Sequence, residues 1–121
     1  MTVPIWRALP VLAACMCCAP SAGQAHAILL ESQPSASRSV AAGHVDIRLR
    51  FNSRIDAGRS RLTLTRPDHT QAVLPAQADG AGNVLTAAAD IAPGAYSLRW
   101  QVLAIDGHIT RGDVPFTVTG N

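Results

Sequence analysis

Two side chains that can bind a metal ion flank a single glycine near the C-terminal end, in Asp106-Gly107-His108. If a β-strand stays extended through Gly107, both side chains lie on one face with Cα atoms roughly 6.5 Å apart. A carboxylate and an imidazole at that spacing can both reach one ion. Taken alone the motif is weak evidence, because Asp-Gly is a common turn dipeptide and such pairs are more often structural.

A histidine also follows a small-x-small triplet, Gly23-Gln24-Ala25. Cleavage after Ala25 would make His26 the first residue of the mature chain, with a free amine. Such amines have a pKa of about 7.7–8.0. That amine loses its proton to a metal at little cost near neutral pH, and it forms a chelate with the imidazole of the same residue. The alternative is that His26 is an ordinary residue near the start of a strand.

With Asp106 and His108, a mature His26 would bring the donors to three nitrogens and one oxygen. A mixed nitrogen and oxygen set in a tetragonal arrangement suits Cu(II), which also stands highest in the Irving–Williams order. A soft Cu(I) site is not expected, because Met1, Met16 and all three cysteines precede His26.

The first 25 residues have the pattern of a cleaved secretory signal peptide. Residues 1–7 carry one positive charge, residues 8–18 (ALPVLAACMCC) are apolar, and residues 19–25 (APSAGQA) are small and turn-prone. The apolar segment is shorter than the roughly 20 residues that a spanning helix needs. We therefore expect a signal peptide at 1–25 and an exported domain at 26–121.

Two other interpretations of this segment stay open. Leu12-Ala13-Ala14-Cys15 resembles a bacterial lipobox, which would lipidate Cys15, anchor the chain to a membrane and leave His26 without a free amine. Only about seven apolar residues precede that cysteine, at the bottom of the usual range. A buried N-terminal helix is the other interpretation, and the prolines at positions 4, 10 and 20 disfavour it.

Composition limits the exported part to one small domain without a disulfide. It would have 96 residues, and all three cysteines precede it. Removing Arg7 leaves nine of the ten basic residues against eight acids. Because the charges are nearly balanced and not clustered, nucleic acid is not an expected partner.

Hydrophobic alternation predicts an all-β fold. Apolar and polar side chains alternate over residues 44–51 (HVDIRLRF), the pattern of a half-buried strand. The same kind of pattern predicts further strands at 27–30, 60–66, 71–74, 83–88, 96–104 and 114–118. About seven short strands favour an immunoglobulin-like Greek-key β-sandwich with Trp100 in its core. Residues 87–89, all alanine, could be helical, but they are too few to change the fold class.

Together these motifs resemble the CopC-type periplasmic copper-binding proteins of bacteria. The motifs that carry the resemblance are His26-Ala27 with Ser32-x-Pro34, Leu49-x-Phe51, Pro93-Gly94-x-Tyr96-x-Leu98-x-Trp100-x-Val102, Asp106-Gly107-His108 and Gly112-x-x-x-Phe116-x-Val118. The resemblance covers essentially all of 26–121. It implies an immunoglobulin-like sandwich that binds one Cu(II) through His26, Asp106 and His108.

Two departures from the family pattern change what is expected. Some members have a methionine-rich loop for Cu(I), and since both methionines here precede residue 26, that second site should be absent. Many members also have a carboxylate near the copper, two positions after the strand-ending phenylalanine. That position is Ser53 in Phe51-Asn52-Ser53, so the site would lack this carboxylate.

The resemblance implies a periplasmic protein that buffers or carries Cu(II) for resistance or homeostasis, and that is not an enzyme. It further implies delivery to an inner-membrane copper transporter of the CopD type, and we expect a monomer. The alternative is a copper-dependent oxidative enzyme with a histidine-brace-like site, which Asp106 disfavours because an anionic equatorial ligand opposes reduction. A structural sandwich without a metal is the third interpretation.

The remaining polar residues receive simpler interpretations. His44 precedes a strand and His69 follows Pro67-Asp68, so both are expected to be solvated loop residues. Arg111 and Asp113 would either orient the site through hydrogen bonds or form ion pairs on the surface.

Overall fold

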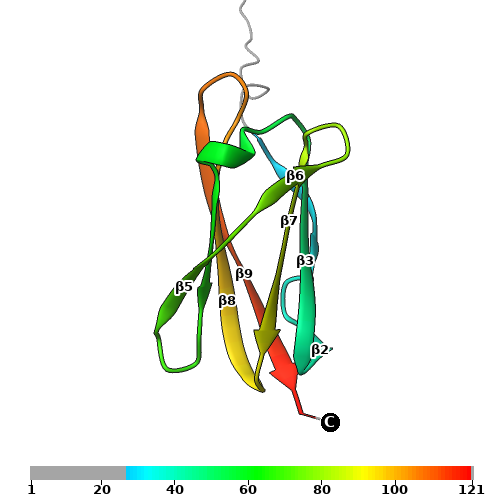
Figure 1. The fold of residues 1–121 in the computed structure, drawn as a ribbon, viewed down its shortest axis with the longest axis vertical. Coiled ribbons are helices and arrows are strands. Elements are labelled where there is room, and N and C mark those ends of the chain that lie inside the picture. The colour runs from blue at the N-terminus through cyan, green and yellow to red at the C-terminus, as the bar shows by residue number, and fades with distance from the viewer. Residues whose placement is uncertain (1–26, 121) are drawn as a thin grey trace, which may run out of the picture.

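Two β-sheets pack face to face in the computed structural model, which describes residues 27–120 (Figure 1). One sheet has the strand order β1-β3-β7-β6, with β1 at Leu29–Gln33, β3 at Gly43–Phe51, β7 at Val84–Ile91 and β6 at Gln77–Asp79. The other has the order β2-β9-β8-β4-β5, with β2 at Arg38–Ala41, β9 at Ile109–Thr119, β8 at Gly94–Leu103, β4 at Arg61–Thr65 and β5 at Gln71–Leu74. A 3-10 helix, η2, covers Ala57–Arg59.

The connections follow the immunoglobulin-like pattern. The chain passes from one sheet to the other between β3 and β4 and again between β7 and β8, as Greek-key sandwiches require. All strand pairs are antiparallel except β2 with β9. The predicted all-β sandwich is therefore confirmed.

The number of strands differs from the prediction, because residues 27–120 form nine strands instead of about seven. The two additional strands are β2 and β6, which are short edge strands with mostly exposed residues. Each pairs with one neighbouring strand only, and because few of their side chains are buried, their sequences show no clear alternation of apolar and polar residues. The alanines at 87–89, considered as a possible helix, lie within β7.

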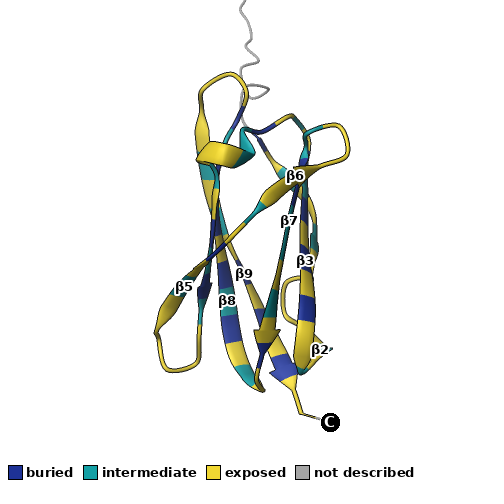
Figure 2. Ribbon diagram, in the orientation of Figure 1, coloured by how far each residue is buried: buried dark blue, intermediate teal, exposed yellow. Residues whose placement is uncertain are grey.

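Alternating side chains of the long strands form the core (Figure 2). Phe51 and Trp100 meet edge to face between the sheets, with ring centroids 5.3 Å apart. Tyr96 stacks on Phe116, and its hydroxyl donates to the Ala92 carbonyl at 2.7 Å, which fixes the start of β8. Within residues 27–120 no polar or charged residue is fully buried, so any chemistry lies at the surface.

The loops at one end of the sandwich bring distant parts of the sequence together. Figure 1 shows the β8–β9 loop, η2 and the β6–β7 loop at the end opposite the C-terminus. No helix in the described part of the chain has the length and apolar character needed to cross a bilayer.

Candidate metal centre

The Asp106-Gly107-His108 motif lies in the tight loop that joins β8 to β9. The Gly107 N–H donates to the Ala104 carbonyl at 2.9 Å, and the Ala104 N–H donates to the His108 carbonyl at 2.8 Å. Gly107 has a φ of 95°, a conformation that favours glycine. The strand therefore does not stay extended through Gly107, and the Asp-Gly dipeptide forms a turn, which was the alternative that the sequence left open.

The turn nevertheless brings the two predicted ligands into contact. The His108 backbone N–H donates to Asp106 Oδ1 at 3.1 Å, and His108 Nδ1 lies 3.2 Å from Asp106 Oδ2. Both oxygens of one carboxylate thus face the same histidine. The two side chains are accessible to solvent, so an ion could reach them.

The loop also lowers the pKa of the carboxylate. The hydrogen bond from the His108 backbone N–H is the main reason why the pKa of Asp106 is below its usual value, and the His108 side chain lowers it further. Asp106 is therefore deprotonated at neutral pH and can bind a cation without first losing a proton.

The first described residues lie at the same end as this loop. Ala27 is only 1% exposed, and its carbonyl accepts a hydrogen bond of 2.9 Å from Thr110 Oγ1, two residues after His108. Next to it, Ile28 and Asn52 are joined by two hydrogen bonds, of 2.7 and 3.0 Å. The chain is thereby fixed beside the β8–β9 loop up to Ala27.

The third predicted ligand, His26, and the predicted signal peptide at 1–25 lie outside the described residues. Within residues 27–120, no group of three or more His, Cys, Asp or Glu side chains is arranged to hold a metal ion. Asp106 and His108 supply two donors, fewer than a tetragonal Cu(II) ion takes. A carboxylate and an imidazole are donors that suit copper.

The segment that follows β3 also lies at this end of the sandwich, where it contacts the β8–β9 loop. The Ile105 N–H donates to the Arg54 carbonyl at 3.1 Å, and Ile55 pairs with Ala104 in an isolated bridge. Ser53 lies between Asn52 and Arg54 in the sequence, and its Oγ is buried. No sequence pattern indicated that Asn52 and Thr110 would anchor the start of the described chain, because a lone polar residue beside a strand has no distinctive pattern.

The other two histidines lie away from this loop. His44 was expected in a loop but is the second residue of β3, where it faces Asp46 on the same strand and Asp90 on β7. The alternating run predicted over residues 44–51 already included this histidine, and β3 starts one residue earlier, at Gly43. His69 lies in the turn between β4 and β5, as predicted.

Arg111 and Asp113 each pair with a residue of β8. Arg111 Nε donates to Gln101 Oε1 at 2.8 Å, and Asp113 accepts hydrogen bonds of 3.1 and 3.2 Å from Arg99. These pairs join β8 and β9 along the sheet, so of the two interpretations the surface ion pair is the correct one for Asp113.

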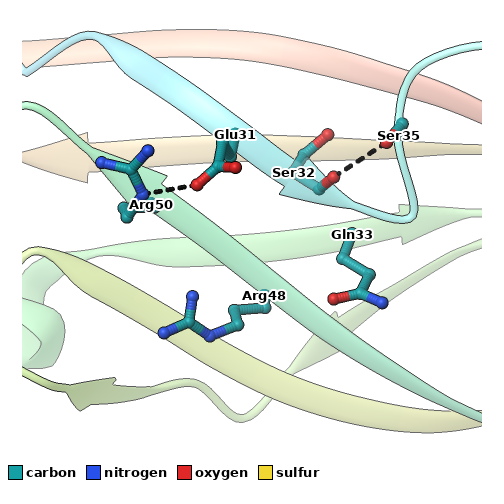
Figure 3. A pocket seen from close by; sticks show the side chains of 6 residues that line it. All are labelled: Glu31, Ser32, Gln33, Ser35, Arg48 and Arg50. Atoms are coloured by element: carbon teal, nitrogen blue, oxygen red, sulfur yellow. Dashed lines mark hydrogen bonds and ion pairs between the residues drawn. The ribbon is translucent and has the colours of Figure 1, made fainter.

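A polar pocket on the outer side of β1 and β3 is separate from this loop (Figure 3). Its lining consists of Glu31, Ser32, Gln33, Ser35, Arg48 and Arg50. Arg50 Nε donates to Glu31 Oε1 at 2.6 Å, so the one carboxylate in the pocket is already paired. The pocket contains no histidine and does not resemble a copper site.

Comparison with known proteins identifies the family. The model of the CopC domain family matches residues 29–119. The chain belongs to the CopC family. Protein YobA from Escherichia coli K12 is 33% identical over 98 residues, covering 78% of this chain and 79% of YobA.

Solved CopC-type structures share the fold. CopC from Methylosinus trichosporium OB3b aligns with a TM-score of 0.73 and 29% identity, covering 79% of this chain and 96% of that structure. PcoC from Escherichia coli, described as a methionine-rich copper resistance protein, aligns with a TM-score of 0.63 and 29% identity, covering 78% of this chain and all of PcoC. The CopC family membership agrees with the resemblance that the sequence motifs carry.

Proposed function

We propose that this CopC family member is a periplasmic protein that binds one Cu(II) ion and buffers or carries it for resistance and homeostasis. Family membership and the contact between Asp106 and His108 support the proposal. The related PcoC is described as a methionine-rich copper resistance protein. This chain has no methionine after Met16, which favours a Cu(II) site with nitrogen and oxygen donors over a Cu(I) site.

The observation that carries the proposal is the position of Ala27. Its carbonyl is bonded to Thr110, which follows His108 by two residues. The first described residue, Ala27, therefore lies at the end of the sandwich that holds the β8–β9 loop. This supports a site that combines the amine and imidazole of His26 with Asp106 and His108.

Each group has its own role in the proposed site. The amine and the imidazole of His26 chelate the ion, and His108 supplies a second imidazole. Asp106 supplies an oxygen and a negative charge that offsets part of the charge of the divalent ion. An aspartate is ionised near neutral pH, and the His108 backbone N–H, which lowers the pKa of Asp106, keeps this carboxylate free of a proton to a still lower pH.

A buffering or carrying role fits this donor set better than catalysis. An anionic Asp106 ligand stabilises Cu(II) relative to Cu(I), and an oxidative copper enzyme must pass through Cu(I). We therefore propose that the copper is cargo, and that the protein does not turn over a substrate.

Delivery of this cargo requires a surface that a partner can cover. Ile105 and Ile109 flank the Asp106-Gly107-His108 motif, and they are 65% and 52% exposed. Exposed apolar side chains beside a binding site are typical of interaction surfaces. We propose that the monomeric protein delivers copper there to an inner-membrane transporter of the CopD type.

Copper titration of the exported protein tests the proposal, after its intact mass has established where the mature chain begins. We expect a start at His26 and one Cu(II) per chain. Asp106→Asn keeps an oxygen that can accept from the His108 N–H but removes the charge, so affinity should fall by about 10–100-fold. Asp113→Asn is the matched control and should bind as the wild type does. A mature protein that binds no copper, or a lipidated start at Cys15, would contradict the proposal.

A further inference from the structure

The sequence contains two Asp-Gly dipeptides, Asp79-Gly80 and Asp106-Gly107. They lie in the β6–β7 loop and the β8–β9 loop, both at the end of the sandwich opposite the C-terminus (Figure 1). Glycine has no side chain to shield its backbone nitrogen, so in Asp-Gly this nitrogen can approach the preceding carboxyl group closely. Whether the nitrogen can attack that group depends on how the loop holds the two, and the two loops differ in this respect.

In the β6–β7 loop the two reacting groups are already in contact. The Gly80 N–H donates to Asp79 Oδ1 at 2.7 Å, and because Oδ1 is bonded to Cγ, the nitrogen also lies close to Cγ. Both residues are exposed to water. Space around Gly80 is open, since the nearest atom to the position of an added Cβ is Asn83 Oδ1 at 3.9 Å. The loop thus holds a nucleophile beside its target, which speeds a reaction strongly.

In the β8–β9 loop the same two groups are held apart by other partners. The Gly107 N–H donates to the Ala104 carbonyl at 2.9 Å. The Asp106 carboxylate faces the next residue along, because Oδ1 accepts from the His108 N–H at 3.1 Å and Oδ2 lies 3.2 Å from His108 Nδ1. An attack by the Gly107 nitrogen would have to break these contacts first.

We propose that Asp79 is a site of spontaneous covalent modification, at which the folded protein converts aspartate into isoaspartate. The Gly80 nitrogen attacks Cγ of the Asp79 carboxyl group, an N–Cγ bond forms, the Cγ–OH bond breaks, and the hydroxyl group leaves as water with the amide proton. Water then opens the five-membered succinimide. Opening at the N–Cγ bond restores aspartate, and opening at the main-chain carbonyl gives isoaspartate, whose backbone runs through the former side chain. The reaction needs only water.

The test ages the whole protein at mildly acidic pH and raised temperature, folded in one sample and unfolded in guanidinium chloride in another. Peptide mapping with electron-transfer fragmentation distinguishes isoaspartate from aspartate, which has the same mass. In the folded protein, isoaspartate should form at position 79 at least roughly tenfold faster than at position 106, since a misplacement of about 1 Å can cost about 100-fold in rate. In guanidinium chloride this geometric difference is lost, and the two rates should become similar.

Asp79→Glu is the matched variant, because it keeps a carboxylate but would have to close a six-membered ring, which forms far more slowly. The isoaspartate signal from the β6–β7 loop should therefore disappear, and the signal at position 106 should not change. Absence of isoaspartate at position 79 in the folded protein would overturn the proposal. Equal rates at the two positions in the folded protein, or the same ratio of rates in the folded and unfolded samples, would also overturn it. None of these results depends on copper, so the proposed function is tested separately.

Discussion

Both ends of the sandwich place a histidine against carboxylates at nearly equal distances. At the loop end, His108 Nδ1 lies 3.2 Å from Asp106 Oδ2. At the opposite end, His44 Nε2 lies 3.1 Å from Asp46 Oδ1, and its Nδ1 lies 3.3 Å from Asp90 Oδ1. If only the histidine–carboxylate contacts are counted, the end that holds His44 has more potential metal ligands than the loop end.

The surroundings distinguish the two ends. The ring of His44 bridges two carboxylates that are 85% and 88% exposed, and each ring nitrogen faces a different one. The three groups therefore do not converge on one point, and exposed pairs of this kind contribute little to stability. The Asp106 side chain is 36% exposed, accepts the His108 N–H, and lies at the end where buried Ala27 is fixed. A short histidine–carboxylate distance thus does not by itself identify a metal site, and our proposal for the loop end rests on the convergence of several chain segments there.

The largest effect on the loop end is expected from pH. In model peptides the pKa is about 6.5 for histidine and about 7.7–8.0 for an α-amine. Protons compete with copper for these nitrogens. Apparent Cu(II) affinity should therefore fall between about pH 8 and pH 5, by roughly tenfold per pH unit for each protonated nitrogen. The lowered pKa of Asp106 keeps its carboxylate charged over this range, and its contribution would be lost only at a pH below its usual pKa. Competition titrations at several pH values measure the slope, and a flat profile would exclude nitrogen ligation.

The next largest effect should come from blocking the amine. A Gly-Ser extension before His26 keeps the imidazole but converts the amine into an amide, which gives up its proton far less readily. Affinity should fall by more than the roughly 10–100-fold that loss of an orienting group causes. If the extended protein binds copper as tightly as the protein that begins at His26, then His26 is an ordinary strand residue. The loop end would then have fewer copper ligands than we infer.

Removing one histidine from each end compares them directly. His108→Ala removes one donor but leaves the His26 chelate, so affinity should fall by at least about tenfold. His44→Ala should leave copper affinity unchanged, although it removes a ring with two carboxylate contacts. Isothermal titration with a competing chelator measures both, and an equal loss in the two variants would abolish the distinction.

The smallest effect is expected from loosening the start of the chain. Thr110→Val removes the hydrogen bond to the Ala27 carbonyl, which we expect to cost about 1 kcal/mol or roughly fivefold in affinity. Thr119→Val removes a similar bond, of 3.3 Å to the Val40 carbonyl, near the opposite end and serves as the control. A larger loss of copper affinity in Thr119→Val would show that the position of Ala27 is irrelevant.

Alternation predicted the long strands because each buries every second side chain, as in residues 43–51 and 94–103. It could not predict β6, where all three residues are exposed. Sequence spacing alone could not decide between an extended strand and a turn at Gly107, and a turn brings Asp106 and His108 together. The anchoring of the start of the described chain by Asn52 and Thr110 depends on which segments pack beside them, and a single sequence does not encode that in any local pattern.

The central claim is that His26 and His108 bind the same copper ion. The double variant His44→Ala/His69→Ala tests it most directly, because a mature chain starting at residue 26 then keeps only His26 and His108 as histidines. Pulsed EPR of its Cu(II) complex counts the imidazoles through their remote nitrogens. We predict two equatorial imidazoles on one copper, and a spectrum with one imidazole or none would contradict the account.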